Sequence, residues 1–310
     1  MTKLNKKYVI GTHIMWFEIE MYKDFIDGMV NLLQTVENKE NVTIDLCLNL
    51  SQHLETIDRN QITESDIVSK FNKGIITLEE LGYNVVSKVH TDEDGFYFHT
   101  DYRRDLNYHY CKKVDYVMWG ETDSFFPKEA FEAIETLSKY TDEQNIHRYL
   151  LSFADRKMWD ASWDALVHND YVNHTFVDDD KQHLNLNQAK SPLPIDKMNE
   201  INAKAEDFDF TYINYPKISG ACLVLSADLI KFGVNIPPCL LYNDDEGLSI
   251  MAQKLLCKNL LHIHARRHPQ KRLYVLDENN PNSFGDKKNN NFQKFLQLSK
   301  ANIQNLINGN

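Results

Sequence analysis

Residues 114–134, VDYVMWGETDSFFPKEAFEAI, decide the fold class of this chain. Their first part, Val114–Trp119, is a short apolar run of β-branched and aromatic residues, which is typical of a buried strand. Two acidic residues, Glu121 and Asp123, follow shortly after this run. A helical pattern then begins at Pro127, and proline favours the first position of a helix. The stretch therefore predicts a buried strand that ends in two carboxylates and leads into a helix.

The same alternation continues on both sides of this stretch. Apolar runs predict further strands over Tyr8–Thr12, Val42–Leu48, Tyr83–Val89, His147–Phe153, Lys217–Leu225 and Leu260–His264. Helical spacing of apolar residues predicts helices over Ile19–Leu33, Glu64–Leu81, Asp101–Lys112, Pro127–Lys139, Ser226–Phe232, Asp244–Cys257 and Phe292–Ile307. This pattern indicates an α/β fold in which a Rossmann-like, mainly parallel sheet is flanked by helices.

Size and composition fit one domain with a short extension. The chain has 310 residues, and 42% of them are hydrophobic, which is ample for a core. We expect one domain over residues 1–270, within which the polar stretch 155–207 forms an insertion or lid. We expect residues 271–310 to form a linker and an amphipathic helix.

Charge and motif content exclude several classes of protein. The formal net charge of −11 argues against extensive wrapping of nucleic acid, although a basic cluster occurs near residues 264–272. The five cysteines contain no CxxC pair, and no segment is apolar enough to span a membrane. The motifs GxxxxGK[ST], GxGxxG and GxSxG are absent. We therefore expect a soluble protein of the cytoplasm.

In open α/β sheets, ligands bind beyond the carboxyl ends of the strands. Besides Glu121 and Asp123, this rule directs attention to Thr12 and His13 after the first predicted strand, and to Asn49 after the second. Paired carboxylates suit a hard divalent cation, and such a cation suits a diphosphate leaving group. The alternative is that the two acidic residues only stabilise the start of the following helix.

The segment Val114–Ile134 resembles the acidic-x-Asp motif of GT-A-fold glycosyltransferases of the family 2 type. Glu121 matches the first acidic position, Thr122 the middle position and Asp123 the last. The family more often has aspartate at the first position, so Glu121 departs from its pattern and could contact the ribose instead of the metal. The resemblance implies a GT-A-like catalytic domain that binds a UDP-sugar and Mn²⁺ or Mg²⁺, with Asp123 and Glu121 as metal ligands.

A second stretch, Tyr215–Leu256, is similar to the acceptor side of the same family. There a turn of small residues, here Ser219-Gly220-Ala221, precedes a strand, and an acidic pair, here Asp244-Asp245, begins a helix. The resemblance implies an inverting transfer with Asp245 as the general base, since a carboxylate must take the acceptor proton. Asp244 and Glu246 are alternatives. Acids at this place can also simply stabilise a helix N-terminus.

Further positions follow from the same resemblance. Thr12, His13 and Asn49 match places that contact the nucleobase and ribose of the donor, and Arg104 matches a place near the pyrophosphate. His264 matches a late histidine that serves as a further metal ligand. The alternative for Arg104 and its neighbour Arg103 is a solvated helix face.

The identity of the acceptor depends on weaker features. The basic cluster, together with Trp159, Trp163 and Tyr171 in the polar insertion, would suit a viral enzyme that glycosylates 5-hydroxymethylcytosine in double-stranded DNA after flipping the base. A glycan or protein acceptor is the first alternative. A degenerate protein that binds nucleotide sugars without turning them over is the second.

Overall fold

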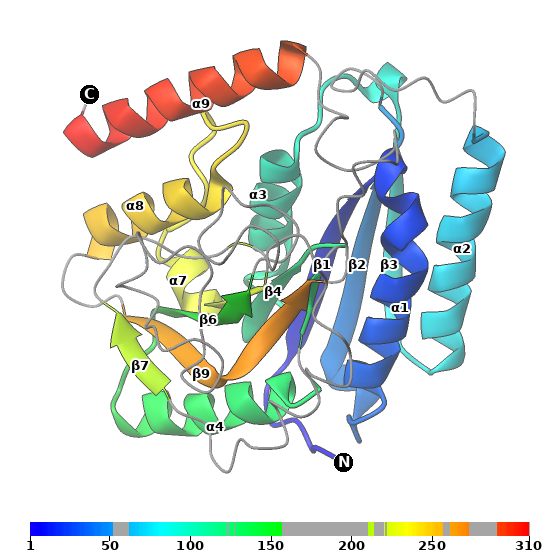
Figure 1. The fold of residues 1–310 in the computed structure, drawn as a ribbon. Helices are drawn as coiled ribbons and strands as arrows, with labels where there is room; N and C mark the ends of the chain where they lie inside the picture. The colour runs from blue at the N-terminus through cyan, green and yellow to red at the C-terminus, as the bar shows by residue number, and fades with distance from the viewer. Residues whose placement is uncertain are drawn as a thin grey trace.

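The structure is a computed structural model that describes residues 1–51, 62–122, 124–126, 128–156, 210–213, 220, 222–256, 261–272 and 290–309. Its strands form one sheet in the order β3-β2-β1-β4-β8-β6-β9-β5, with β7 also paired to β9 (Figure 1). The strands are β1 (Tyr8–Met15), β2 (Val42–Asn49), β3 (Asn84–His90), β4 (Tyr116–Gly120), β5 (Ser124–Phe125), β6 (Tyr149–Arg156), β7 (Phe210–Ile213), β8 (Leu223–Ser226) and β9 (Leu261–Arg272).

The pairings confirm a mainly parallel sheet. The pairs β1–β2, β2–β3, β1–β4 and β6–β9 are parallel. The strand β8 lies between β4 and β6 and is antiparallel to both, so β6 and β9 point the same way as β4. Six long strands therefore share one direction. The short strands β5 and β7, both antiparallel to β9, extend the sheet at its far side.

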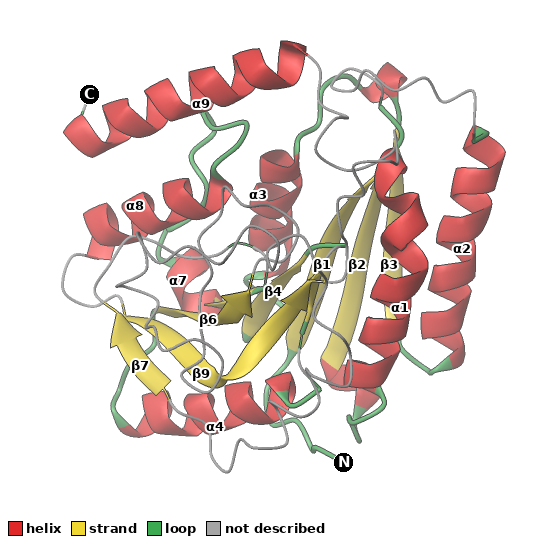
Figure 2. Cartoon of the chain, in the orientation of Figure 1, coloured by secondary structure: helices red, strands yellow, loops and turns green. Residues whose placement is uncertain are grey.

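Helices cover both faces of this sheet, as the alternation of strand and helix predicts. They are α1 (Ile19–Leu33), α2 (Glu64–Glu80), α3 (His99–Tyr110), α4 (Ala130–Glu143), α7 (Ala227–Lys231), α8 (Asp244–Leu256) and α9 (Asn290–Asn308). Figure 2 shows α1 and α2 on one side of β1–β3, with α3 on the other. The helix α2 begins at a Thr63 N-cap whose hydroxyl accepts from Asp66 N, and it is followed by Gly82 at φ 89°.

Two apolar cores lie on opposite faces of the sheet. Adjacent residues of one strand alternate between them: Val117 belongs to the core under α3, α7 and α8, whereas Met118 belongs to the core under α1, α2 and α4. Strands with both faces buried read as continuous apolar runs, which is why β4 was recognisable from its sequence. Gly11 of β1 permits α3 to approach closely, because a Cβ there would lie 2.2 Å from Leu106 Cδ2.

The predicted elements are confirmed where they fall on described residues, but several of their ends differ. The strand β1 continues to Met15, so Thr12 and His13 lie within the strand and are buried instead of following its end. The strand β9 continues past Pro269 to Arg272. The polar stretch 155–207 lies outside the described residues except for the last two residues of β6. Its role as an insertion or lid stays a prediction.

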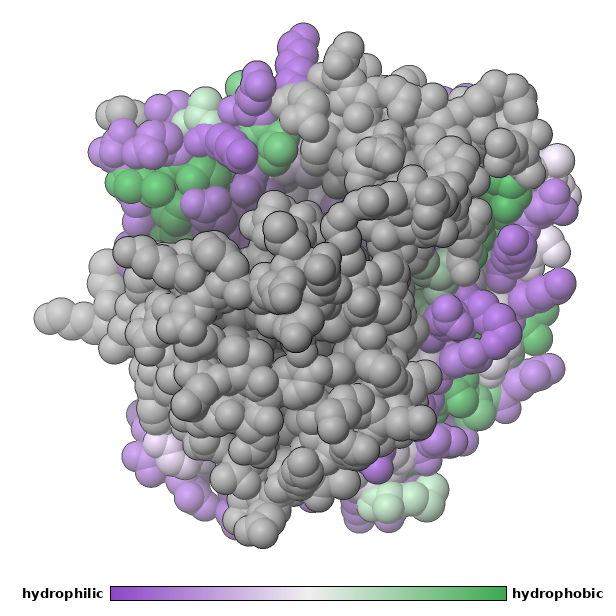
Figure 3. Space-filling view, viewed as in Figure 1, coloured by the Kyte–Doolittle hydropathy of each residue, from purple (hydrophilic) through white to green (hydrophobic). Residues whose placement is uncertain are grey.

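The C-terminal helix α9 is amphipathic and packs on α8. Its Ile303 is buried in the core under α8, whereas Leu298 and Ile307 are exposed. Hydrophobic side chains gather at the upper left of Figure 3, in the region that α8 and α9 occupy in Figure 1. Among the described residues, no helix has the length and apolar character that crossing a membrane requires.

Candidate functional site

Arg103 of α3 brings together acidic residues that are distant in the sequence. Its Nη1 donates to Asp244 Oδ2 at 2.5 Å, and its Nη2 lies 3.2 Å from Glu121 Oε1. Nη2 also donates to the Gly220 carbonyl oxygen at 2.7 Å, while the guanidinium lies 4.7 Å from the Trp119 ring centroid. The end of β4 and the start of α8 therefore meet around one buried cation. We call Arg103, Glu121, Gly220, Asp244 and Asp245 the acidic site.

The residues of the acidic site are carried by separate elements, β4, α3 and α8, each of which is formed by its own local sequence. Glu121 follows the last residue of β4, a strand fully buried on both faces. Asp244 and Asp245 occupy the first turn of α8, where the partial positive charge of a helix N-terminus favours carboxylates. Arg103 is only 2% exposed, so burial disfavours its charge, but the carboxylates of Asp244 and Glu121 more than compensate and raise its pKa.

The two adjacent aspartates differ in their electrostatic surroundings. Burial raises the pKa of the Asp244 carboxyl, but Arg103 outweighs this effect and the pKa is lowered. Burial and the Asp244 charge raise the pKa of Asp245 to about 7. Asp245 Oδ1 accepts from Glu246 N at 2.8 Å and its Oδ2 accepts from Gly220 N at 3.3 Å. At neutral pH the Asp244 carboxyl is thus ionised, whereas the Asp245 carboxyl can both bind and release a proton.

Gly220 is the small residue that permits this approach. A Cβ at this position would lie 2.9 Å from Arg103 Nη1 and 3.3 Å from Asp245 Cβ. Its backbone serves both charged groups, since its carbonyl accepts from Arg103 and its N–H donates to Asp245. The neighbours Ser219 and Ala221, predicted to form the small turn, lie outside the described residues.

His13 and Asn49, predicted from two different strands, are in contact. Asn49 Nδ2 lies 3.2 Å from His13 Nε2, and the same amide nitrogen donates to the Tyr97 carbonyl oxygen at 2.8 Å. Ser51 N donates to Asn49 Oδ1, which fixes the orientation of the amide. His13 Nε2 must therefore accept, and the proton of the neutral ring is on Nδ1.

His13 is held in its neutral form. Burial lowers its pKa well below the usual value, and the nearby His99, Arg103 and His90 act in the same direction. Its Nδ1 is buried and has no hydrogen-bond partner among the described residues, and the same holds for Thr12 Oγ1. Thr12 faces β4 at Gly120, where a Cβ would lie 2.6 Å from the threonine hydroxyl. The pair His13 and Asn49 thus offers a buried donor next to the acidic site.

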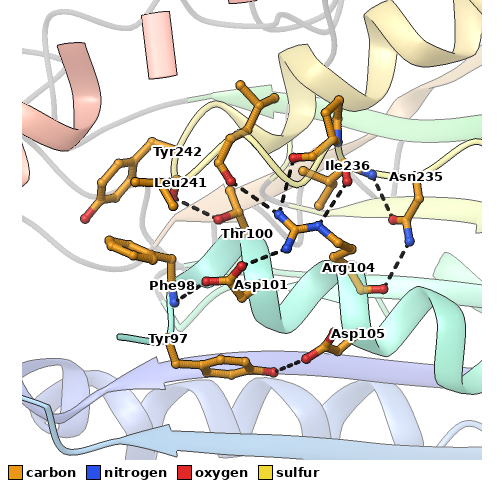
Figure 4. Close-up of polar contacts among 12 residues, drawn as sticks. Tyr97, Phe98, Thr100, Asp101, Arg104, Asp105, Asn235, Ile236, Leu241 and Tyr242 are labelled. Carbon is orange, nitrogen blue, oxygen red and sulfur yellow. Dashed lines mark hydrogen bonds and ion pairs between the residues drawn. The ribbon is translucent and has the colours of Figure 1, made fainter. Parts of the chain in front are cut away.

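Arg104, which is predicted to lie near the donor pyrophosphate, contacts the loop before α8. Its guanidinium donates to the carbonyl oxygens of Ile236, Pro237 and Leu240 and forms an ion pair with Asp101 at 2.7 Å (Figure 4). These contacts hold the loop before α8, and none of them reaches the acidic site. One helical position separates Arg104 from Arg103, which turns the two side chains about 100° apart.

The predicted metal ligands are described only in part. Asp123 lies outside the described residues, and only the backbone of His264 is described. The described residues contain no group of three or more His, Cys, Asp or Glu that could hold a metal ion. Glu121 Oε1 is paired with Arg103, so this carboxylate is already partly neutralised. Carboxylate ligands suit Mn²⁺ or Mg²⁺, and the roles of Asp123, Glu121 and His264 as metal ligands stay predictions.

The backbone register bears on which part of β9 lies near Asp123. The strand β5 begins one residue after Asp123 and pairs with Lys271 and Arg272. On the neighbouring strand β6, His264 pairs with Ser152 and Lys271 pairs with Arg156. These two β6 residues are four positions apart. Four strand positions correspond to roughly 13 Å. The register therefore places Lys271 and Arg272, rather than His264, beside the segment that follows Asp123.

The sequence-based prediction missed Arg103 and His99. His99 Nε2 lies 3.9 Å from Asp244 Oδ2, and its ring packs edge-on against His13 at 5.5 Å. A signal for Arg103 was present, because it shares the buried stripe of α3 with Leu106 and Tyr110 at spacings of three and four residues. A charged residue within an apolar stripe requires a buried partner.

Comparisons with known proteins give only remote likenesses. No family model matches the chain, and no curated protein matches it. Among solved structures, S. aureus TarS 1-349 in complex with UDP-GlcNAc is 12% identical at a TM-score of 0.44, covering 96% of this chain and 67% of that one. A second TarS 1-349 structure is also 12% identical, at a TM-score of 0.43, with coverage of 84% and 60%.

Glucosyl-3-phosphoglycerate synthase from Mycobacterium tuberculosis, in complex with Mg²⁺ and UDP, is 11% identical at a TM-score of 0.42, covering 87% of this chain and 72% of that one. The chain thus spans between three fifths and three quarters of these three structures. Likenesses at TM-scores below 0.5 do not establish an activity, so the function has to be argued from the residues of this chain.

Proposed function

We propose that this chain is a glycosyltransferase that moves a sugar from a nucleotide-sugar donor to a hydroxyl group. In particular, the donor is a UDP-sugar, the transfer is inverting, and Asp245 is the general base. The observation that carries this proposal is the convergence of Glu121 with Asp244 and Asp245 around Arg103. The family resemblance of the sequence implies that Glu121 lies on the donor side and that Asp244 and Asp245 lie on the acceptor side.

Asp245 has the properties that a general base requires. A base works best when its pKa is near the operating pH, and the pKa of Asp245 is raised to about 7. In the proposed step, the acceptor oxygen bonds to the anomeric carbon and Asp245 takes the hydroxyl proton. The bond between that carbon and the phosphate oxygen breaks, and UDP leaves with the electron pair. Asp244 stays ionised beside Arg103 and cannot serve as readily.

Donor binding is assigned to the pair His13 and Asn49. His13 Nδ1 is a buried donor without a partner among the described residues, and a nucleobase carbonyl would satisfy it. Thr12 contributes a buried hydroxyl one residue earlier on β1. A divalent cation, held by Asp123 with Glu121, would neutralise charge on the departing diphosphate. Arg104 binds the loop before α8, so its role in this reaction would be indirect.

The acceptor proposed is 5-hydroxymethylcytosine in double-stranded DNA. Its support is the basic cluster between His264 and Arg272, whose backbone belongs to β9 beside β5. The residues Trp159, Trp163 and Tyr171, which would stack on a flipped base, lie outside the described residues. The formal net charge of −11 weighs against a broad DNA-binding face, so any contact with DNA is local to this cluster.

A transfer assay separates these alternatives. The protein is incubated with a panel of UDP-sugars and Mn²⁺, with and without hydroxymethylated DNA, and the products are analysed by mass spectrometry. Sugar attached to DNA supports the full proposal, while release of UDP without DNA labelling leaves a glycan or protein acceptor. Binding of UDP-sugars without release of UDP would identify a degenerate binding protein. The absence of both binding and release would overturn the proposal.

A further inference from the structure

The loop over residues 235–243 connects β8 and α7 to the first turn of α8 and is held firmly by α3. Arg104 donates to three of its carbonyl oxygens, and Thr100 Oγ1 donates to the Leu241 carbonyl oxygen at 2.9 Å (Figure 4). The Phe98 ring packs edge-on against Tyr242, with 5.6 Å between ring centroids. One side of the loop is therefore fixed by the same helix that carries Arg103.

The other side of this loop is held by the C-terminal helix α9. Ser299 Oγ accepts from Leu241 N at 3.1 Å and from Tyr242 N at 3.0 Å. Asn302 Nδ2, one turn further along α9, donates to the Cys239 carbonyl oxygen at 2.7 Å. Ser299 is completely buried, so its loss would leave two backbone N–H groups without their partner.

The loop and the first turn of α8 form one packed unit. Asn243 has a left-handed conformation with φ 61°, and its carbonyl oxygen accepts the first bond of α8 from Gly247 N at 2.9 Å. Leu240 packs against the same glycine so closely that a Cβ on Gly247 would lie 2.1 Å from Leu240 Cδ1. A shift of residues 240–242 is therefore transmitted to Asp244 and Asp245, which lie between these contacts.

We infer that α9 positions the acidic pair Asp244–Asp245, with Ser299 as the positioning residue and Asn302 as a weaker second contact. This inference rests on the proposed function for its catalytic consequence but not for its structural one. Ser299 is distant from Arg103 in the sequence and contacts none of the reacting groups. Its effect is on the direction of the Asp245 carboxylate, and general-base catalysis is sensitive to displacements of about 1 Å.

The test uses the full chain with two variants and one control. Ser299→Ala removes both bonds to the loop, and Asn302→Ala removes the third bond from a less buried site, so it folds even if Ser299→Ala does not. Gln304→Ala is the control, because Gln304 is exposed on α9 and its side chain donates to Asn308 within the same helix. Hydrogen exchange of the backbone amides is measured together with kcat and the donor KM.

The expected result is a local change. Ser299→Ala increases exchange at residues 241–248 while the amides of β1 and α1 keep their protection, and kcat falls about ten-fold or more with the donor KM within about two-fold. Asn302→Ala shows the same pattern with a smaller loss of about three-fold, and Gln304→Ala matches the unaltered protein. A uniform change of exchange across the chain, or an unchanged kcat despite faster exchange at residues 244–248, would overturn the inference.

Failure of the proposed function gives a different result. If the unaltered protein releases no UDP from any donor, the glycosyltransferase proposal fails, and hydrogen exchange alone decides the inference. Faster exchange at residues 244–248 in Ser299→Ala then still supports α9 as the element that positions the acidic pair. Unchanged exchange there refutes it, whatever the activity.

Discussion

Arg103 Nη1 lies 2.5 Å from Asp244 Oδ2, which joins α3 to the first turn of α8 through an ion pair whose guanidinium is buried. The same guanidinium lies 3.2 Å from Glu121 Oε1 at the end of β4. Burial raises the pKa of Asp245, and the charge of Asp244, which Arg103 keeps ionised, raises it further. A single buried cation therefore joins the elements of the acidic site, while burial and the charge of Asp244 shift the pKa of Asp245 in the opposite direction to that of its neighbour.

Replacing Arg103 should be costly for stability and activity. In Arg103→Gln the carboxylates of Asp244 and Glu121 lose their buried partner, so we expect a loss of about 3 kcal/mol in the free energy of unfolding. Denaturant unfolding measures this loss. Lys112→Gln, an exposed position on the turn after α3, is the control and should have no effect. A loss of less than about 0.5 kcal/mol in Arg103→Gln would show that the ion pair does not hold the site together.

The pH dependence of turnover should report the ionisation of Asp245. A general base must be deprotonated, so kcat/KM should rise with pH up to about 7 and then level off. Asp245→Asn should abolish turnover at every pH. Rate profiles between pH 5 and 9 test this, and a rate that falls through pH 7 would contradict the role of Asp245.

The raised pKa of Asp245 also affects the stability of the fold, which should fall as the pH rises. The pKa of Asp245 in the folded state is raised from its usual value of 3.8 to about 7, so the stability that this carboxyl contributes is present below about pH 4 and is lost as pH rises through about 7. Asparagine does not ionise, so Asp245→Asn does not lose this stability as the pH rises. The melting temperature of the variant relative to the unaltered protein should therefore be higher at pH 8 than at pH 4, and an equal difference at both values would contradict the raised pKa.

Gly220→Ala should disturb the acidic site with little effect on the rest of the fold. The added Cβ would lie 2.9 Å from Arg103 Nη1 and 3.3 Å from Asp245 Cβ, so both groups would have to shift to accommodate it. We expect turnover to fall about ten-fold or more, because general-base geometry tolerates little displacement. The measurement is kcat with the melting temperature recorded in parallel, and an unchanged kcat would show that Asp245 is not used.

Removal of divalent metal should abolish turnover. Incubation with a chelator followed by desalting should leave a folded, inactive protein, and Mn²⁺ or Mg²⁺ should restore the rate, since the leaving diphosphate needs charge neutralisation. Asp123→Asn should not recover when metal is added back. Full activity in the presence of excess chelator would refute a metal-dependent transfer.

Much of the fold could be predicted from local pattern because β1 and β4 are buried on both faces and read as apolar runs. The antiparallel direction of β8 could not, since an apolar run has no direction of its own. At the acidic site, Glu121 was found because it follows a predicted strand, whereas Asp244 and Asp245 were found because they resemble an acidic pair that begins a helix. Arg103 was not chosen over Arg104 as a site residue. Which of the two arginines reaches the acidic site depends on which face of α3 packs against α8, and local sequence does not specify this tertiary contact.

The most direct test of this account is release of UDP from a panel of UDP-sugars in the presence of Mn²⁺, compared between the unaltered protein and Asp245→Asn. The account predicts metal-dependent release and acceptor labelling by the unaltered protein, and a loss of at least about 100-fold in the variant, in line with the usual contribution of general-base catalysis. Equal turnover by both proteins, or no binding of any nucleotide sugar by either, would contradict it.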